Sequence, residues 1–408
     1  MQDTIFFFFG PKIKMLLSTM NTLSVTRNIN SSPGYNESFK STSSQDPYLI
    51  LKELNDEAAI RFLPVILFLV ILMVIGTAGN VIVGIIYSRR RKKTTSDFFI
   101  LNLAFLDLLT CTIGIPMEIA DLSFSYTFDA PAACKILRTI ESWTSMASAL
   151  TLVIISIDRY KRICKFGDNF SNKAVKRLCL LALLVGALLS WPAAVIVGKK
   201  TINLGIPGVK GADCSTSDEM KKTVYPLIYY SVVMLCFIAC VVFVIFVYVR
   251  ISIFIKRAKT ERRKVIGPSE ISNTTLSQHQ IPLMNVNINH MESVHSTPSN
   301  EDDINGNEHV HARVTKQTSA VKVTRTTTIF VAITIAFIVS YLPFLAVMIL
   351  RNVIKGLERN MSPVVEVFYK FCLKSFFINN AINPLIYSFL CRKFKQDVKA
   401  LLRCKPIR

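Results

Sequence analysis

The chain has 408 residues, of which 51% are apolar, and its mean hydropathy is +0.41. This composition excludes an ordinary water-soluble globule, and it makes length a poor guide to the number of domains. The net charge of +21 would suit a nucleic-acid-binding protein. The way in which Lys and Arg are distributed along the chain, described below, instead excludes nucleic acid as the expected partner.

Apolar stretches of membrane-spanning length recur along the chain. A helix needs about 20 mostly apolar residues to cross a hydrocarbon core roughly 30 Å thick. Six stretches meet this requirement: Phe62–Tyr87, Phe98–Leu122, Ile136–Ile157, Leu178–Val197, Tyr225–Val249 and Thr328–Leu350. A seventh, Val364–Leu390, carries three charged residues but is mostly apolar from Ser375 onward. The sequence therefore predicts an all-α membrane protein, a seven-helix bundle formed by residues 62–267 and 320–390.

Basic residues cluster on one side of the predicted bundle. They follow the first, fifth and seventh spans and separate the third from the fourth, as in the run Arg89–Lys93. Short loops rich in Lys and Arg stay in the cytoplasm, which predicts an extracellular N-terminus and a cytoplasmic C-terminus. An odd number of spans requires the same arrangement. We expect a multi-pass protein of the plasma membrane in contact with lipid.

The polar segments outside the spans fit this orientation. Residues 1–61 are predicted to form a largely disordered extracellular tail with glycosylation acceptors at Asn30 and Asn36, and the residues before Met15 carry little expected weight. Residues 268–319 contain all five histidines and no aromatic residue, and we expect a disordered loop there rather than a metal site. Residues 391–408 have apolar residues at helical spacing, which predicts a short amphipathic helix and cytoplasmic tail.

Six short motifs occur along the chain, each in a different predicted span. They are Gly79-Asn80-Val81, Leu103-Ala104-Phe105-Leu106-Asp107, Asp158-Arg159-Tyr160, Trp191, Pro343 and Asn383-Pro384-Leu385-Ile386-Tyr387. Each is a weak match alone, but their joint occurrence is very improbable by chance. With these motifs the chain resembles the rhodopsin-like (class A) G-protein-coupled receptors, from Phe62 to Arg408 without the long loop.

The resemblance implies a sodium site around a carboxylate in the middle of the membrane. Asp107 would be costly there unless it is satisfied. The family surrounds it with Asn80, Ser148, Asn379 and Asn383, which together enclose a sodium ion as an allosteric ligand. A purely structural hydrogen-bond network is the alternative.

The resemblance also implies a switch that activates heterotrimeric G proteins. Arg159 would be held by Asp158 at rest and released when the sixth helix moves outward, and Tyr160 completes the motif. The residues that would transmit this motion are Tyr248, Phe337, Tyr341, Pro343, Asn383, Pro384 and Tyr387. Tyr341 replaces the usual tryptophan, Cys240 replaces a usual proline and Ala149 replaces a bulkier residue, so the usual relay between ligand and G protein is altered here.

The same resemblance assigns roles to three of the cysteines. Cys134 and Cys214 match the disulfide of the family, and both lie on the predicted extracellular side. Cys404 follows the amphipathic helix and is a palmitoylation candidate. Most other cysteines lie within spans, where we expect reduced thiols that serve packing.

Three acidic residues indicate the ligand. Glu141, Glu118 and Asp121 are expected to face the extracellular cavity above Tyr341, which favours a cationic ligand and, most simply, a peptide. An amine receptor that uses Glu141 as counter-ion is the alternative, and so is neutralisation of Glu141 by Lys370 or Lys374. Phe377 stands where a retinal Schiff base would need lysine, so no retinal and no other cofactor is expected.

Other functional classes lack support in the sequence. A seven-helix transporter would show internal repeats, which we do not find, and no motif of an enzyme is present. The residues after Ser388 contain no serine or threonine, whereas 268–319 is rich in both. We therefore expect receptor kinases and arrestin to act on the long loop.

Overall fold

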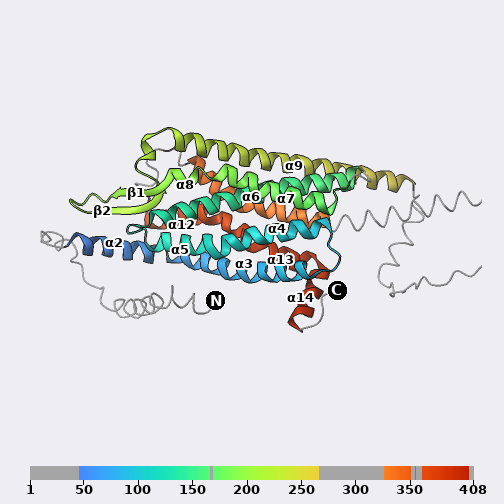
Figure 1. The fold of residues 1–408 in the computed structure, drawn as a ribbon, viewed down its shortest axis with the longest axis horizontal. Coiled ribbons are helices and arrows are strands. Elements are labelled where there is room, and N and C mark those ends of the chain that lie inside the picture. The colour runs from blue at the N-terminus through green and yellow to red at the C-terminus, as the bar shows by residue number, and fades with distance from the viewer. Residues whose placement is uncertain (1–45, 166–168, 266–325, 351–353, 355–360, 404–408) are drawn as a thin grey trace, which may run out of the picture. The chain divides into compact units, whose positions relative to one another are not determined.

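The computed structural model describes residues 46–165, 169–265, 326–350, 354 and 361–403. The chain divides into two units, Met1–Ile50 and Leu51–Arg408, and the bundle belongs to the second. Among the described residues, six helices are long and apolar enough to cross a membrane. Figure 1 shows them running side by side, with the hairpin β1–β2 at one end of the bundle and α14 at the other.

The helices follow the predicted spans but extend beyond them. They are α3 (Leu63–Arg89), α4 (Thr95–Leu109) continued by α5 (Ile115–Ser123), α6 (Pro131–Cys164), α7 (Asn172–Ser190) followed by α8 (Ala193–Ile196), α9 (Tyr225–Val265), and Thr326–Leu350. The seventh segment consists of α12 (Pro363–Lys374), a 3-10 turn at Ser375–Phe377, and α13 (Ile378–Leu390). The break at Ser375 lies where the sequence changes from mixed to apolar. Together these segments confirm the predicted all-α bundle of a membrane protein.

The helix ends explain several of these boundaries. Thr94 and Asp97 form a reciprocal capping box that begins α4, with Asp97 Oδ2 accepting from the Thr94 backbone N–H at 2.7 Å. Ser171 and Ser362 cap α7 and α12 by accepting from the backbone N–H three residues later. The extra turns are polar, so hydropathy alone underestimates the helices.

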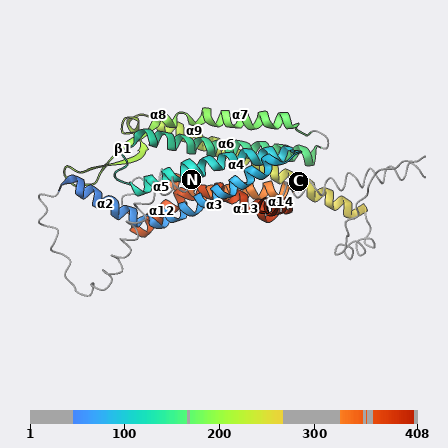
Figure 2. The ribbon, with the colours of Figure 1, turned by 60° about the horizontal axis from the view of Figure 1, so that its bottom comes forward.

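α6 lies at the centre of the bundle. It packs against α4, α7 and α9, while α13 packs against α3, and Figure 2 shows the same arrangement from a second side. The approach of α3 to α13 depends on Gly79, because a Cβ at that position would lie 2.7 Å from Pro384. The motif glycine therefore permits two spans to meet closely.

Two features near the disulfide depart from the expectations. Pro47–Arg61 forms the helix α2, so the predicted disordered tail of residues 1–61 is wrong for this part. Asn55 stabilises the part of α2 in the second unit, since its amide donates to the Ser123 carbonyl at 3.1 Å. The loop after α8 folds into an antiparallel hairpin, β1 (Val197–Asn203) and β2 (Lys210–Thr216), which was not predicted.

Candidate functional site: an ion cluster, a buried carboxylate and an arginine switch

A cluster of charged side chains lies within the bundle near the hairpin. A π-helical turn at Thr110–Gly114 joins α4 to α5, which carries Glu118 and Asp121 one turn apart. On the facing helix α6, Arg138 and Glu141 are also one turn apart. Arg138 donates to all three carboxylates: to Glu118, to Asp121 Oδ2 at 3.1 Å and to Glu141 Oε2 at 2.9 Å. The three acids predicted to act together therefore converge on one guanidinium.

Lys374, at the end of α12, completes this cluster. Its ammonium group donates to Glu118 and not to Glu141, and the ammonium of Lys370 lies 5.2 Å from the ring centroid of Phe62. The cation that contacts Glu141 directly is Arg138, and the charge of Lys374 acts on Glu141 without a direct contact. The signal that could have found Arg138 is its i, i+3 spacing to Glu141, which places both side chains on one helix face.

The cluster is not balanced in charge. Glu118, Asp121 and Glu141 supply three formal negative charges, against two positive charges from Arg138 and Lys374. Asp121 Oδ1 and Glu141 Oε1 are buried without a hydrogen-bond partner among the described residues. Burying a carboxylate oxygen without a partner is costly.

The predicted disulfide joins the helix that carries Arg138 to the hairpin. Cys134 at the start of α6 is bonded to Cys214 of β2, with their Cα atoms 5.5 Å apart. Both sulfurs lie in a small apolar cluster with Phe128, Leu137 and Val197. The disulfide prediction is confirmed, and the bond fixes the hairpin to the helix that provides two members of the ion cluster.

A second polar centre surrounds Asp107, which is fully buried. Asn383 donates to Asp107 Oδ2 at 2.8 Å, whereas the amide of Asn80 donates to the backbone carbonyls of Gly76 and Asn380. Three buried side-chain oxygens lack hydrogen-bond partners among the described residues: Asp107 Oδ1, Asn80 Oδ1 and Asn383 Oδ1.

This donor set fits the implied sodium ion. Carboxylate and amide oxygens are the ligands that hard cations prefer, and a cation would satisfy oxygens that are otherwise costly to bury. Ser148 and Asn379, the other predicted ligands, are also buried, at 3% and 4% exposure. Sodium binding remains a prediction that the geometry supports.

At the opposite end of the bundle, Arg159 is enclosed near the end of α6. Only 3% of its side chain is exposed, and it pairs with Asp158, which is fully buried. Arg159 Nη2 also donates to Ser96 Oγ at 3.2 Å, and its guanidinium lies 5.1 Å from the ring centroid of Phe330. Arg162 donates to Asp158 as well, at 3.0 Å. This is the held arrangement that the resemblance implies for a resting receptor, while Tyr160 is half-buried against a neighbouring apolar cluster.

An aromatic stack lies between the ion cluster and Arg159. The ring centroids of Phe337 and Tyr341 are 4.6 Å apart, and Phe237 of α9 lies 4.8 Å from Tyr341. Phe376 continues the stack towards the seventh segment at 5.7 Å from Tyr341. The stack therefore connects α9 and the turn before α13 to the helix Thr326–Leu350, which is the helix expected to move outward.

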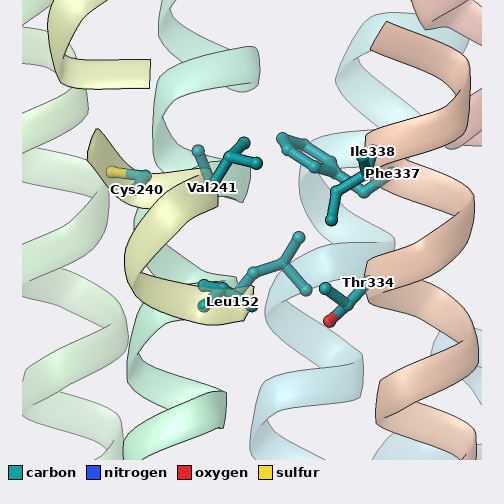
Figure 3. Close-up of a pocket in the computed structure, with 8 residues that line it drawn as sticks. Leu152, Cys240, Val241, Thr334, Phe337 and Ile338 are labelled. Carbon is teal, nitrogen blue, oxygen red and sulfur yellow. The ribbon is translucent and has the colours of Figure 1, made fainter. Parts of the chain in front are cut away.

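A small cavity adjoins this stack (Figure 3). It measures about 10 Å³, enough for one water molecule. It is lined by Ala149, Leu152, Cys240, Val241, Val244, Thr334, Phe337 and Ile338. Two of these residues, Ala149 and Cys240, are among the three positions at which the sequence departs from the family. The smaller side chain at 149 leaves space next to Phe337.

The remaining predicted switch residues lie in the helix interiors. Pro384 is inside α13, and Pro343 is inside the helix Thr326–Leu350. Tyr248 of α9 and Tyr387 of α13 are both buried, and the Tyr387 ring packs on Tyr87 and Phe394 with centroids 6.2 and 6.0 Å away. None of these positions contradicts the predicted role.

A buried ion network attaches α14 (Arg392–Leu402) to the bundle. Arg90 donates to Asp97 at 2.8 Å and to Asp397 at 2.9 Å, and its guanidinium lies 4.0 Å from the ring centroid of Tyr87. Burial by itself lowers the pKa of Arg90, but the hydrogen bond to Asp397 and the nearby charges outweigh it, so the pKa is raised. The predicted amphipathic helix is therefore held by charge as well as by its buried Phe394.

The comparison with known sequences decides the family. The profile described as 7 transmembrane receptor (rhodopsin family) matches residues 79–387, which include both polar centres, the disulfide and the arginine switch. The chain belongs to this family. The protein is thus a signalling receptor and not an enzyme.

Two relatives span most of this receptor. Neuromedin-U receptor 1 of Mus musculus is 21% identical over 363 residues, 86% of this chain and 76% of that receptor. Neuromedin-U receptor 2 of Mus musculus is 22% identical over 342 residues, 82% and 73% of the two chains. The C3a anaphylatoxin chemotactic receptor of Oncorhynchus mykiss is 34% identical over 126 residues, 30% and 34% of the two chains.

Several predicted sites of the receptor lie outside the described residues. They are the glycosylation acceptors Asn30 and Asn36, the palmitoylation candidate Cys404, and the loop 268–319. These sites stay predictions.

Proposed function

We propose that this receptor binds an extracellular peptide with a basic group and activates heterotrimeric G proteins in the plasma membrane, with its N-terminus outside. The observation that carries the ligand class is the ion cluster of Glu118, Asp121 and Glu141. It has one formal negative charge in excess and two buried oxygens without partners among the described residues. A cationic group of the ligand would satisfy both.

The names of the relatives support a peptide over a small amine. Neuromedin-U receptors are named for a peptide, and they match most of the chain.

For signalling, we propose that ligand binding rearranges the stack of Phe237, Phe337 and Tyr341 and that the helix Thr326–Leu350 then moves outward. Arg159 leaves Asp158 in this step and becomes available to the G protein. Pro343 and Pro384 support such pivoting, because each removes a helical hydrogen bond. Asp107, Asn80 and Asn383 would hold a sodium ion in the resting state, where the ion neutralises the buried carboxylate.

The proposal is tested by screening a peptide and amine library on cells that express the receptor with a promiscuous G protein. We expect agonists among peptides that carry Arg, Lys or a free amine, and no response in cells without the receptor. Agonists drawn only from neutral or acidic compounds would contradict the ligand class.

A further inference from the structure

Arg138 differs from the other members of the ion cluster in exposure. Its side chain is 25% exposed, whereas the side chains of Glu118, Asp121, Glu141 and Lys374 are 0%, 11%, 10% and 9% exposed. A group that enters the cluster from solvent therefore meets Arg138 first. Arg138 is also the only member that contacts all three carboxylates.

Arg138 contacts only one oxygen of Asp121 and one oxygen of Glu141. It holds Asp121 through Oδ2 and Glu141 through Oε2, and the other oxygen of each carboxylate, Oδ1 and Oε1, has no hydrogen-bond partner among the described residues. Glu141 as a whole residue is only 8% exposed, so water has little access to hydrogen-bond its Oε1. Lys374 contacts Glu118 directly, and its charge also acts on Asp121 and Glu141.

The nearest further charges do not change this balance. Asp213 of β2 affects Asp121 electrostatically, but it is itself paired with Lys200 at 3.9 Å. The cluster thus retains one formal negative charge, the difference between its three acids and two bases.

We propose that Arg138 is the residue that determines how much charge the ligand can carry into this site. It orients Asp121 and Glu141 so that one oxygen of each receives a single cationic group, and its own charge repels a second one. This inference rests on the proposed function, since it specifies the ligand group as one ammonium or guanidinium and no more. Without Arg138 the site would carry two excess negative charges and would favour a dication.

Two variants separate this role from a simple change in charge. Arg138→Gln and Lys374→Gln each remove one positive charge from the cluster. Only Arg138→Gln also removes the contacts to Asp121 and Glu141, because Lys374 touches neither. If Arg138 sets the specificity, the two variants must differ.

The experiment measures binding of two small probes to the purified full-length receptor in nanodiscs through the midpoint of thermal unfolding. N-acetylagmatine carries one guanidinium, and agmatine carries a guanidinium and an ammonium. Each probe stabilises the receptor by RT ln(1 + c/Kd), where c is the concentration of free probe, so concentration series give the ratio of the two dissociation constants. N-pentylacetamide, which is neutral, serves as the probe control.

In the wild type we expect N-acetylagmatine to bind more tightly than agmatine and the neutral probe not to bind. In Arg138→Gln we expect the ratio to shift towards agmatine by roughly tenfold or more, the scale of a charge-assisted hydrogen bond. Lys374→Gln should keep the wild-type order, and Glu141→Gln should lose N-acetylagmatine. An unchanged ratio in Arg138→Gln, an equal shift in Lys374→Gln, or no binding of either probe to the wild type would overturn the proposal.

A double variant tests the same role if Arg138→Gln alone does not fold. The double variant Glu118→Gln/Arg138→Gln keeps the wild-type formal charge while losing the orienting contacts. We expect it to bind both probes more weakly and with less discrimination than the wild type, and full wild-type discrimination would overturn the role of Arg138. Because no peptide or G protein is used, failure here is distinct from failure of the library screen, which tests the receptor's ligand class.

Discussion

At the scale of single residues, the two ends of the bundle hold ion networks of opposite excess charge. Near the disulfide, three carboxylates outnumber two cations. At the other end, Asp158 is shared by Arg159 and Arg162, so the cations are in excess. Buried charges are costly unless paired, and every charged side chain in the two networks has at least one partner of opposite sign. Under the proposed function, the first network receives a cationic ligand, and the second releases Arg159.

The role of Glu141 in ligand binding can be tested by Glu141→Gln. The substitution keeps the size of the side chain but removes the charge that a ligand cation would meet. We expect agonist potency to fall by about 1.5–3 kcal/mol, the scale of a hydrogen bond to a charged group. Dose–response curves at matched surface expression measure the shift.

The control for this substitution is Glu219→Gln, which removes an exposed acid outside the ion cluster. Unchanged potency in Glu141→Gln would mean that the contact of Glu141 with Arg138 is structural and not part of the ligand site.

The sodium site can be tested without any agonist. A ligand that binds the folded state raises the midpoint of thermal unfolding as its concentration increases. We expect NaCl to stabilise the wild type more than choline chloride at equal ionic strength, and Asp107→Asn to remove the difference. A sodium effect that persists in Asp107→Asn would place the ion elsewhere.

At the scale of elements, α14 is attached through a junction that also contacts the arginine switch. Arg90 joins Asp397 of α14 to Asp97 at the start of α4. One residue earlier in α4, Ser96 accepts a hydrogen bond from Arg159. The first turn of α4 is therefore linked to α14 through Arg90 and contacts Arg159 of the switch directly.

The attachment of α14 predicts a change in the reactivity of a neighbouring thiol. Cys391, just before α14, is half-buried against the core. Asp397→Asn leaves Arg90 with one acid and weakens the only charged contact of α14 with the bundle among the described residues. We expect the thiol of Cys391 to be alkylated several-fold faster, as measured by peptide mass spectrometry. Lys399→Gln, at an exposed position of the same helix, should leave the rate unchanged, and equal rates in both variants would refute the attachment.

The sequence predicts the elements better than their ends and contacts. Hydropathy finds each span because the bilayer requires apolar residues, but it misses the polar extension of α9 to Val265 and the helix Pro47–Arg61. The hairpin β1–β2 is missed because apolar and polar residues do not alternate clearly along Val197–Asn203 or Lys210–Thr216. The contacts of Arg138 with Glu118 and Asp121 are missed because a pairing between separate helices depends on their rotation, which the π-helical turn at Thr110–Gly114 alters.

At the scale of the whole molecule, the receptor is expected to be switched off through its long loop. The residues after Ser388 offer no hydroxyl to receptor kinases, whereas 268–319 contains many. Each phosphate adds roughly −1.5 to −2 charge and strong hydrogen-bond acceptors, which suit a basic partner such as arrestin. We predict that replacing every Ser and Thr of 268–319 by Ala abolishes agonist-dependent arrestin recruitment and leaves G-protein signalling intact. Undiminished recruitment in this variant would refute the prediction.

The central claim is that a ligand signal reaches a G protein through Arg159. The most direct measurement is agonist-stimulated nucleotide exchange on a purified heterotrimeric G protein by the receptor in nanodiscs, with Arg159→Ala and Arg162→Ala as a matched pair. Both variants remove a partner of Asp158, but only the first removes the guanidinium assigned to the G protein. We predict that Arg159→Ala binds the agonist and catalyses no exchange above background, while Arg162→Ala retains exchange. Wild-type exchange by a folded, agonist-bound Arg159→Ala receptor would contradict the account.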